Sequence, residues 1–224
     1  MHSEIIIYFA YRDGENDELE QQHREAFEQH ADFETSPAFV ETKFGSVRVL
    51  SNDVPDVTGM SHLENYEYGD EWDLLYSPLI KYWIGEDRYL EGGDDNPFGA
   101  EEGEPLQQFV KMVATGYEAT DERPVAVYAE TPRHAFDIHQ TGNPPFTAES
   151  LANDEYDHLS WLAVFTPPMV ETYGRETLLS APAWEVRELD DGAIIVLCHD
   201  DVEWETDCRH VAEYIGLPAH EDIH

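Results

Sequence analysis

Hydrophobic positions in the N-terminal part of the chain follow first a strand pattern and then a helical one. Residues 4–11 form a short apolar run that is typical of a buried strand. Residues 15–31 predict a helix, because one stripe at helical spacing carries Leu19, His23, Ala26, Phe27 and His30. Between Phe39 and Leu50, two strand-like runs flank Gly45-Ser46, which predicts a β-hairpin.

The pattern is irregular between residues 52 and 103. Aromatic islands occur at 72–76 and 79–84, and the clearest loop is the Gly- and Asp-rich stretch 92–97. A weak subdivision of the chain, if there is one, would therefore fall near 92–104. No repeat or low-complexity linker is evident, so we predict a single domain over 1–224.

Regular periodicity returns in the second half. The periodicity predicts a helix from Pro105 through Tyr117, followed by a strand over 124–129 and a short helix from Thr131-Pro132. Further along, it predicts a strand over 160–166 and a helix from Pro167-Pro168 to Gly174. Two strands then flank Asp190-Asp191-Gly192, a strong hairpin signal because Asp-Gly supplies the positive φ angles of a tight turn. A last helix over 207–215 is stopped by Gly216. The sum predicts an α+β fold, a mixed sheet with antiparallel hairpins covered by helices.

Charge changes this picture more than any motif. The 224 residues include 49 acidic and 12 basic side chains, a formal net charge of -37, and only three lysines. Residues 1–112 carry 26 acids and 7 bases, a net of -19, and the remainder carries -18. This even distribution of charge indicates a solvated surface adapted to concentrated salt. It argues against a nucleic-acid mimic, and against nucleic acid or an anionic membrane as a partner.

Composition and hydropathy also indicate where in the cell the protein is found. The hydrophobic share of 41% and the five tryptophans indicate a folded core rather than disorder. No apolar run reaches the length of a membrane span, and the start lacks the basic region of a signal peptide. Two cysteines, Cys198 and Cys208, imply no disulfide framework. We therefore expect a cytoplasmic protein that is not bound to a membrane.

Catalytic and cofactor motifs are missing from the sequence. It contains no dinucleotide fingerprint, phosphate-binding loop, nucleophile elbow or paired-cysteine zinc site. His23 and His30 lie on one helical stripe and could bind a metal, but a packed, hydrogen-bonded pair is the favoured interpretation. His134 and His139 are five residues apart, a poor spacing for one helical face.

The sharpest polar cluster is Cys198-His199-Asp200-Asp201, directly after a predicted strand. A thiol, an imidazole and carboxylates at a strand end could form a metal site or a Cys–His nucleophile pair, to which His134 or His139 could contribute. The simpler interpretation is a small buried Cys followed by an acidic turn, because Asp-Asp also occurs at two other places. On this basis we predict no catalytic, metal or cofactor residues.

The C-terminal third carries a resemblance to a known family. Its elements are the stretch 160–179 (SWLAVFTPPMVETYGRETLL), the hairpin 186–197 (VRELDDGAIIVL) and the closing stretch 214–218 (YIGLP). A Trp-initiated strand, a Pro-led helix ending at Gly and a strand pair turning on Asp/Gly resemble immunity proteins associated with type VI secretion and polymorphic toxins. The resemblance covers about residues 158–218 and implies neutralisation of a toxin by direct binding, without catalysis.

Two function classes follow from these observations. The first is a non-enzymatic intracellular binding protein with a toxin-like partner, which would use an aromatic centre drawn from Tyr66, Tyr68, Trp72, Tyr76, Tyr82, Trp83 and Tyr89. The alternative is a small metal-dependent or Cys/His hydrolase of unknown substrate. For most of these aromatic residues, simple packing in the core is the more common role.

The charge predicts a dependence of folding on salt. Lowering the KCl concentration from 3 M to 0.1 M lengthens the screening distance from a few ångströms to about 10 Å, so the surface carboxylates repel one another more strongly. We expect secondary and tertiary structure to loosen over that range, as measured by far- and near-UV circular dichroism across a dilution series. Unchanged spectra in dilute buffer would contradict the adaptation to salt.

Overall fold

The computed structural model describes residues 5–51, 79–84, 104–130, 145–200 and 207–219. Its strands are β1 (Ile5–Ala10), β2 (Glu34–Thr35), β3 (Val40–Thr42), β4 (Gly45–Ser51), β5 (Leu79–Ile84), β6 (Ala126–Glu130), β7 (Leu162–Phe165), β8 (Glu185–Glu188) and β9 (Ile194–Leu197). The described helices are α1 (Asn16–Gln29), α3 (Glu104–Tyr117), α5 (Ala148–Ala152), α6 (Pro167–Tyr173), α7 (Arg175–Leu179) and α8 (Arg209–Ile215).

All nine strands belong to one sheet, in the order β2-β3-β4-β5-β1-β6-β7-β9-β8. Every pair of neighbouring strands is antiparallel, and a parallel bridge joins Leu159 to Ala219 outside the named strands. The α+β fold predicted from the sequence is confirmed. Strand β1 lies in the middle, where it pairs with β5 on one side and β6 on the other, so it joins the two halves of the chain.

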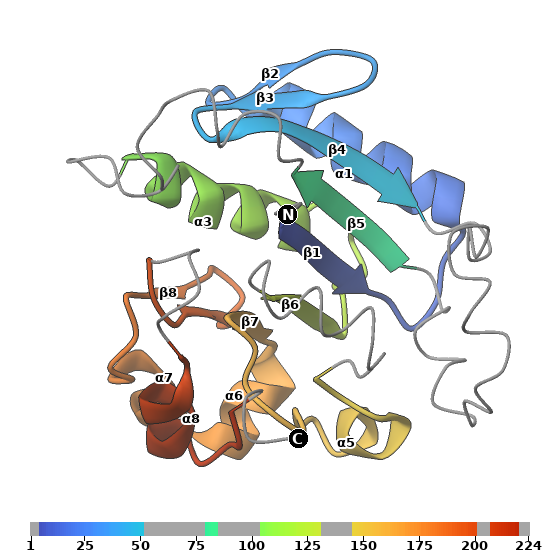
Figure 1. The fold of residues 1–224 in the computed structure, drawn as a ribbon. Coiled ribbons are helices and arrows are strands. Elements are labelled where there is room, and N and C mark those ends of the chain that lie inside the picture. Colours follow the sequence, from blue (N-terminus) through green and yellow to red (C-terminus); the bar gives the residue numbers. More distant parts are fainter. Residues whose placement is uncertain (1–4, 52–78, 85–103, 131–144, 201–206, 220–224) are drawn as a thin grey trace, which may run out of the picture.

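Helices α1 and α3 cover one face of the sheet. Figure 1 shows α1 running beside β4 and β5, and α3 lying next to β1, where these elements contact one another. The approach of α3 is closest at Gly116, where a Cβ atom would lie 2.4 Å from Tyr82 Oη and 2.7 Å from Phe9 Cζ. Glycine at this position therefore lets the helix sit directly on the aromatic side chains of β1 and β5.

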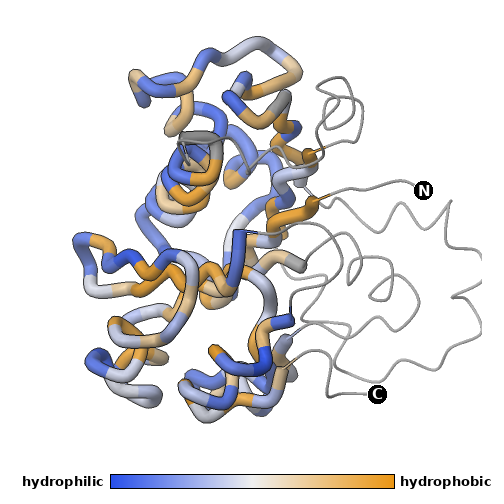
Figure 2. Tube along the Cα trace, turned by 60° about the vertical axis from the view of Figure 1, so that its left-hand side comes forward, coloured by the Kyte–Doolittle hydropathy of each residue, from blue (hydrophilic) through white to orange (hydrophobic). Residues whose placement is uncertain are grey.

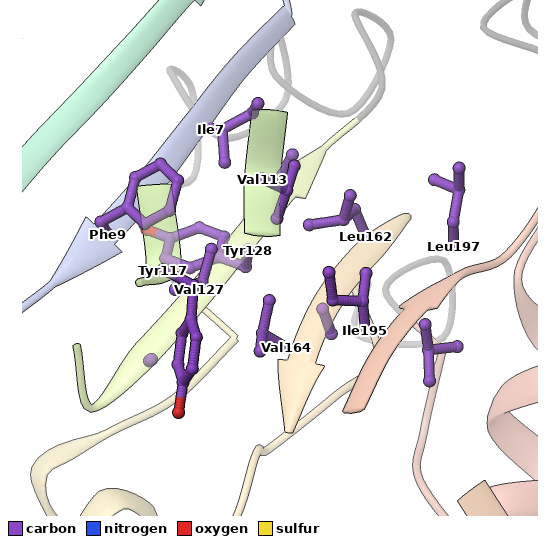
Figure 3. Close-up of a cluster of buried hydrophobic side chains, with 14 of the residues drawn as sticks. Ile7, Phe9, Val113, Tyr117, Val127, Tyr128, Leu162, Val164, Ile195 and Leu197 are labelled. Atoms are coloured by element: carbon purple, nitrogen blue, oxygen red, sulfur yellow. The ribbon is translucent and has the colours of Figure 1, made fainter. Parts of the chain in front are cut away.

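The core between α3 and the sheet is formed by residues from distant parts of the sequence. Figure 3 shows Val113 and Tyr117 of α3 beside residues of β1, β6, β7 and β9, labelled Ile7, Phe9, Val127, Leu162, Val164, Ile195 and Leu197. All of these side chains are at most 2% exposed. Their burial from water is the main source of favourable free energy for such a sheet-and-helix arrangement.

The smaller helices follow the C-terminal strands. Helices α6 and α7 contact β7, β8 and β9, and α7 also contacts α8. Figure 2 shows that the coiled, helical parts of the tube carry both hydrophilic and hydrophobic positions, as expected for helices with one face on a core. No helix in the described ranges is both long and apolar enough to cross a membrane.

Local sequence signals explain several element boundaries. The turn between β8 and β9 uses Gly192 at φ +92°, and α8 ends at Gly216, whose φ of +94° is left-handed. Both conformations are unstrained only for glycine. Asp191 holds the same turn in place, because its Oδ1 accepts from the Ala193 amide at 3.0 Å and its Oδ2 accepts from the Tyr117 hydroxyl at 3.0 Å.

The predicted elements that fall on described residues are largely present. The predicted turn at Gly45-Ser46 was wrong by two residues, because Thr42 pairs with Gly45 and the turn is Lys43-Phe44. Strand β2 and helices α5 and α7 were not predicted; each is five residues or shorter, too short to show a period. The short helix expected from Thr131-Pro132, and the loop at 92–97, lie outside the described residues.

The packing at Gly116 predicts an unusual response to alanine. In an exposed helix Gly→Ala stabilises by up to about 1 kcal/mol. Here the new methyl group would collide with Tyr82 and Phe9, so we expect Gly116→Ala to lower the free energy of unfolding by about 2 kcal/mol. Urea-induced unfolding followed by circular dichroism measures the change, and an unchanged or higher midpoint would contradict this close approach.

Candidate functional site

His23 lies in the core between α1 and the sheet, held by two tyrosines. Its Nε2 is 2.6 Å from Tyr11 Oη, and its Nδ1 is 2.5 Å from Tyr82 Oη. A neutral imidazole has one N–H donor and one acceptor, so one tyrosine donates to the ring and the other accepts from it. Burial lowers the pKa of His23 to about 3, which keeps the ring neutral at physiological pH.

His30 does not join His23 in a common site. It is the half-buried residue that ends α1, its ring packs against Phe33 at a centroid distance of 5.2 Å, and its Nδ1 accepts from the Asp32 amide at 3.3 Å. Among the described residues, no three His, Cys, Asp or Glu side chains are grouped so as to hold a metal ion. His23 is a packed core residue with both ring nitrogens engaged.

The Cys198-His199-Asp200 cluster lies at the end of β9 and is largely inside the protein. Cys198 is 3% exposed, and its Sγ is 3.5 Å from the Ser160 carbonyl oxygen. The Trp161 indole N–H donates to the His199 carbonyl oxygen at 2.9 Å, and the two rings lie 6.3 Å apart. A nucleophilic thiol needs access and a nearby positive charge, so this geometry favours the packing role. Asp201, His134 and His139 lie outside the described residues.

Of the aromatic residues proposed as a binding centre, the structure describes Tyr82 and Trp83, which lie on opposite faces of the sheet. Tyr82 is fully buried against His23, whereas its neighbour Trp83 points to the other face of the sheet and is half-buried. The remaining members of that set, Tyr66, Tyr68, Trp72, Tyr76 and Tyr89, lie outside the described residues.

Trp83 belongs to a surface that the sequence did not predict as a unit. On the sheet face opposite α1 and α3, three adjacent strands bring together six side chains, which we call the aromatic–cationic face: Arg48 and Leu50 of β4, Lys81 and Trp83 of β5, and Ile6 and Tyr8 of β1. The pairing places Trp83 between Arg48 and Ile6, and Lys81 between Leu50 and Tyr8. Two cross-strand rows therefore run side by side.

Cations and rings contact each other throughout this face. The Arg48 guanidinium contacts two rings, 4.9 Å from the centroid of Trp83 and 5.1 Å from that of Phe39. The Lys81 ammonium lies 5.7 Å from the Tyr8 ring centroid, and Tyr8 in turn stacks on Tyr128 at 4.9 Å. Such contacts are worth about 0.5–1 kcal/mol each at exposed sites and more when desolvated.

Part of the aromatic–cationic face is open to solvent. Arg48 is exposed and Leu50 is 40% exposed, while Lys81, Trp83 and Tyr8 are half-buried. In the described part of the chain, the large hydrophobic side chains that are exposed are Leu50 and Tyr214. An exposed leucine beside an arginine and a tryptophan on a rigid sheet has the composition of the centre of a protein–protein contact.

Comparison of the chain with protein-family models, curated proteins and solved structures finds no match. The function therefore has to be inferred from the residues and their arrangement.

The buried His23 predicts a loss of stability in acid. Between pH 6.5 and pH 3 the unfolded chain binds a proton at His23 that the folded protein excludes, so stability falls as the pH falls through this window. From pH 7 to pH 5 this loss amounts to about 2 kcal/mol. Urea-induced unfolding at both pH values measures it.

The control for this prediction is His23→Gln, which retains a hydrogen-bonding amide but does not titrate. This variant should be less stable than the wild type at pH 7, yet its stability should fall less between pH 7 and pH 5. Equal pH dependence in the two proteins would show that His23 does not have a depressed pKa in the folded state.

Proposed function

We propose that this protein is a non-enzymatic binding module that holds a protein partner, and that it acts in the manner of an immunity protein by neutralising a toxin through direct binding. The observation that carries this proposal is the aromatic–cationic face, whose Trp83, Arg48 and Leu50 side chains reach the surface from neighbouring strands. The C-terminal sequence resemblance supports the same function.

The position of this face on the sheet suits it for binding. Strands β4 and β5 are each paired on both sides, and their buried side chains are fixed by α1, so little conformational entropy is lost when a partner docks. Tryptophan and arginine are also the residues that most often dominate binding energy when a partner excludes water from them.

Concentrated salt favours a contact made of apolar side chains and of cations stacked on rings. A chain of net charge -37 is best tolerated where salt is concentrated, and there long-range electrostatic steering is screened. Contacts that depend on apolar area and on rings stacked against cations survive such screening better, because they act at short range and exclude water. Leu50, Trp83 and Arg48 supply contacts of this kind.

The proposal predicts that one substitution on the face weakens partner binding. The partner is first sought by affinity capture in 2 M KCl and among the products of neighbouring genes, and its dissociation constant is then measured by calorimetry. We expect Leu50→Asp to weaken binding at least tenfold, because it places a charge in an apolar contact. Cells that express the toxin should survive with the wild-type chain and not with Leu50→Asp.

The matched control is Tyr214→Ser, which alters the other exposed large hydrophobic side chain of the described residues, on α8. This variant should bind as the wild type does. If capture yields no specific partner and no neighbouring gene product is toxic, the immunity function is refuted. Equal losses in both variants would place the contact elsewhere on the molecule.

A further inference from the structure

Two cations of the aromatic–cationic face contact aromatic rings instead of carboxylates. Of the ten Lys and Arg residues in the described ranges, six form ion pairs with carboxylates: Arg24, Lys111, Arg123, Arg175, Arg187 and Arg209. Across the described ranges, Arg48 and Lys81 contact aromatic rings and form no ion pair with a carboxylate. In a protein with about four acids for every base, two such cations on one surface are unexpected.

The two cations lie on the same face of neighbouring strands. Arg48 pairs with Trp83 and Leu50 pairs with Lys81, so Arg48 and Lys81 are diagonal neighbours on adjacent strands and on the same face. Diagonal neighbours in an antiparallel pair lie within reach of each other's long side chains. An anionic group that docks on this face would therefore be attracted by both cations.

Both cations keep hydrogen-bond donors available for such an anion. The Arg48 guanidinium contacts the rings of Phe39 and Trp83 and forms no ion pair with a described carboxylate, and its fork of N–H donors suits a carboxylate. The Lys81 ammonium is partly removed from water beside Tyr8, and this burial lowers its pKa without a compensating carboxylate among the described residues. A desolvated charge of this kind gains more from an incoming opposite charge than an exposed one does.

We propose that Arg48 and Lys81 bind the carboxylates of an acidic segment on the protein partner, while Leu50 and Trp83 pack against the apolar side chains of that segment. This inference rests on the proposed function and names the chemistry of the contact. A protein segment fits better than a nucleic acid, because a phosphate polymer would extend beyond the two cations onto a surface of net charge -37. Apolar residues beside the cations also match a peptide rather than a bare anion.

The first test is the stability of the protein without a partner. Replacing Lys81 by Met keeps the length of the side chain and removes a charge that is partly buried and unpaired. We expect Lys81→Met to raise Tm by about 2–4 °C, whereas Lys111→Met, which breaks an ion pair with Asp32, should not raise it. A lower Tm for Lys81→Met would show that the ammonium is already neutralised in the folded protein, and would overturn the proposal.

The second test measures binding of a defined probe by NMR. The probe is an acetylated and amidated hexapeptide of alternating Glu and Leu, titrated to millimolar concentration in 0.15 M and 2 M KCl. The indole N–H signal of Trp83, assigned with Trp83→Phe, reports contact with the face. We expect the Glu peptide to shift this signal and the matched Gln peptide to leave it in place, with binding at least tenfold weaker in Arg48→Gln and Lys81→Gln and unchanged in Lys111→Met.

Other outcomes would overturn the inference. Equal shifts with the Gln peptide would show that the face recognises apolar side chains alone, and equal shifts with inorganic phosphate would show a simple anion site. No shift with any probe would also refute it. The failure of this inference can be told apart from the failure of the proposed function. If Leu50→Asp abolishes partner binding while Arg48→Gln and Lys81→Gln leave it intact, the protein is a binding module but does not recognise an acidic segment.

Discussion

The fold depends on the position of β1 between β5 and β6. This strand is hydrogen-bonded along both edges, and five of its six side chains are buried. Among the described strands, its pairing with β6 is the one that joins the first half of the chain to the second. Both pairings connect residues at least 69 positions apart in sequence, and they form only after long loops have closed. The helices that cover the sheet pack on the surface that this pairing creates.

The two faces of the strands around β1 have opposite roles because side chains alternate along a strand. On one face, Phe9 and Tyr82 meet His23 and Gly116 in a tightly packed interior that contains a neutral imidazole. On the other, Tyr8, Lys81 and Trp83 form half of the aromatic–cationic face. The rigidity of the first face is what fixes the geometry of the second, and this coupling is the physical basis of the proposed binding function.

Sequence patterns were most reliable where one element carries its own signal. The helical stripe that ends in Tyr117, the Pro-led start of α6 and the Asp-Gly turn after β8 each depend on contacts within a few residues. The patterns missed β2 and α7, which are held by neighbouring elements rather than by an internal period. At Cys198 and His199 they left chemistry open but favoured packing, and the fold places both side chains largely inside the protein.

The acidic composition, the α+β class and the bounds of most described elements can be read from the chain alone, because they follow from composition and from short-range periodicity. The position of His23 between Tyr11 and Tyr82, and the grouping of Arg48, Lys81 and Trp83 on one face, could be seen only in the folded protein. Such groupings depend on which strands pair and in what register, and a shift of one residue would exchange the two faces. That long-range choice is made by the packing of the whole core.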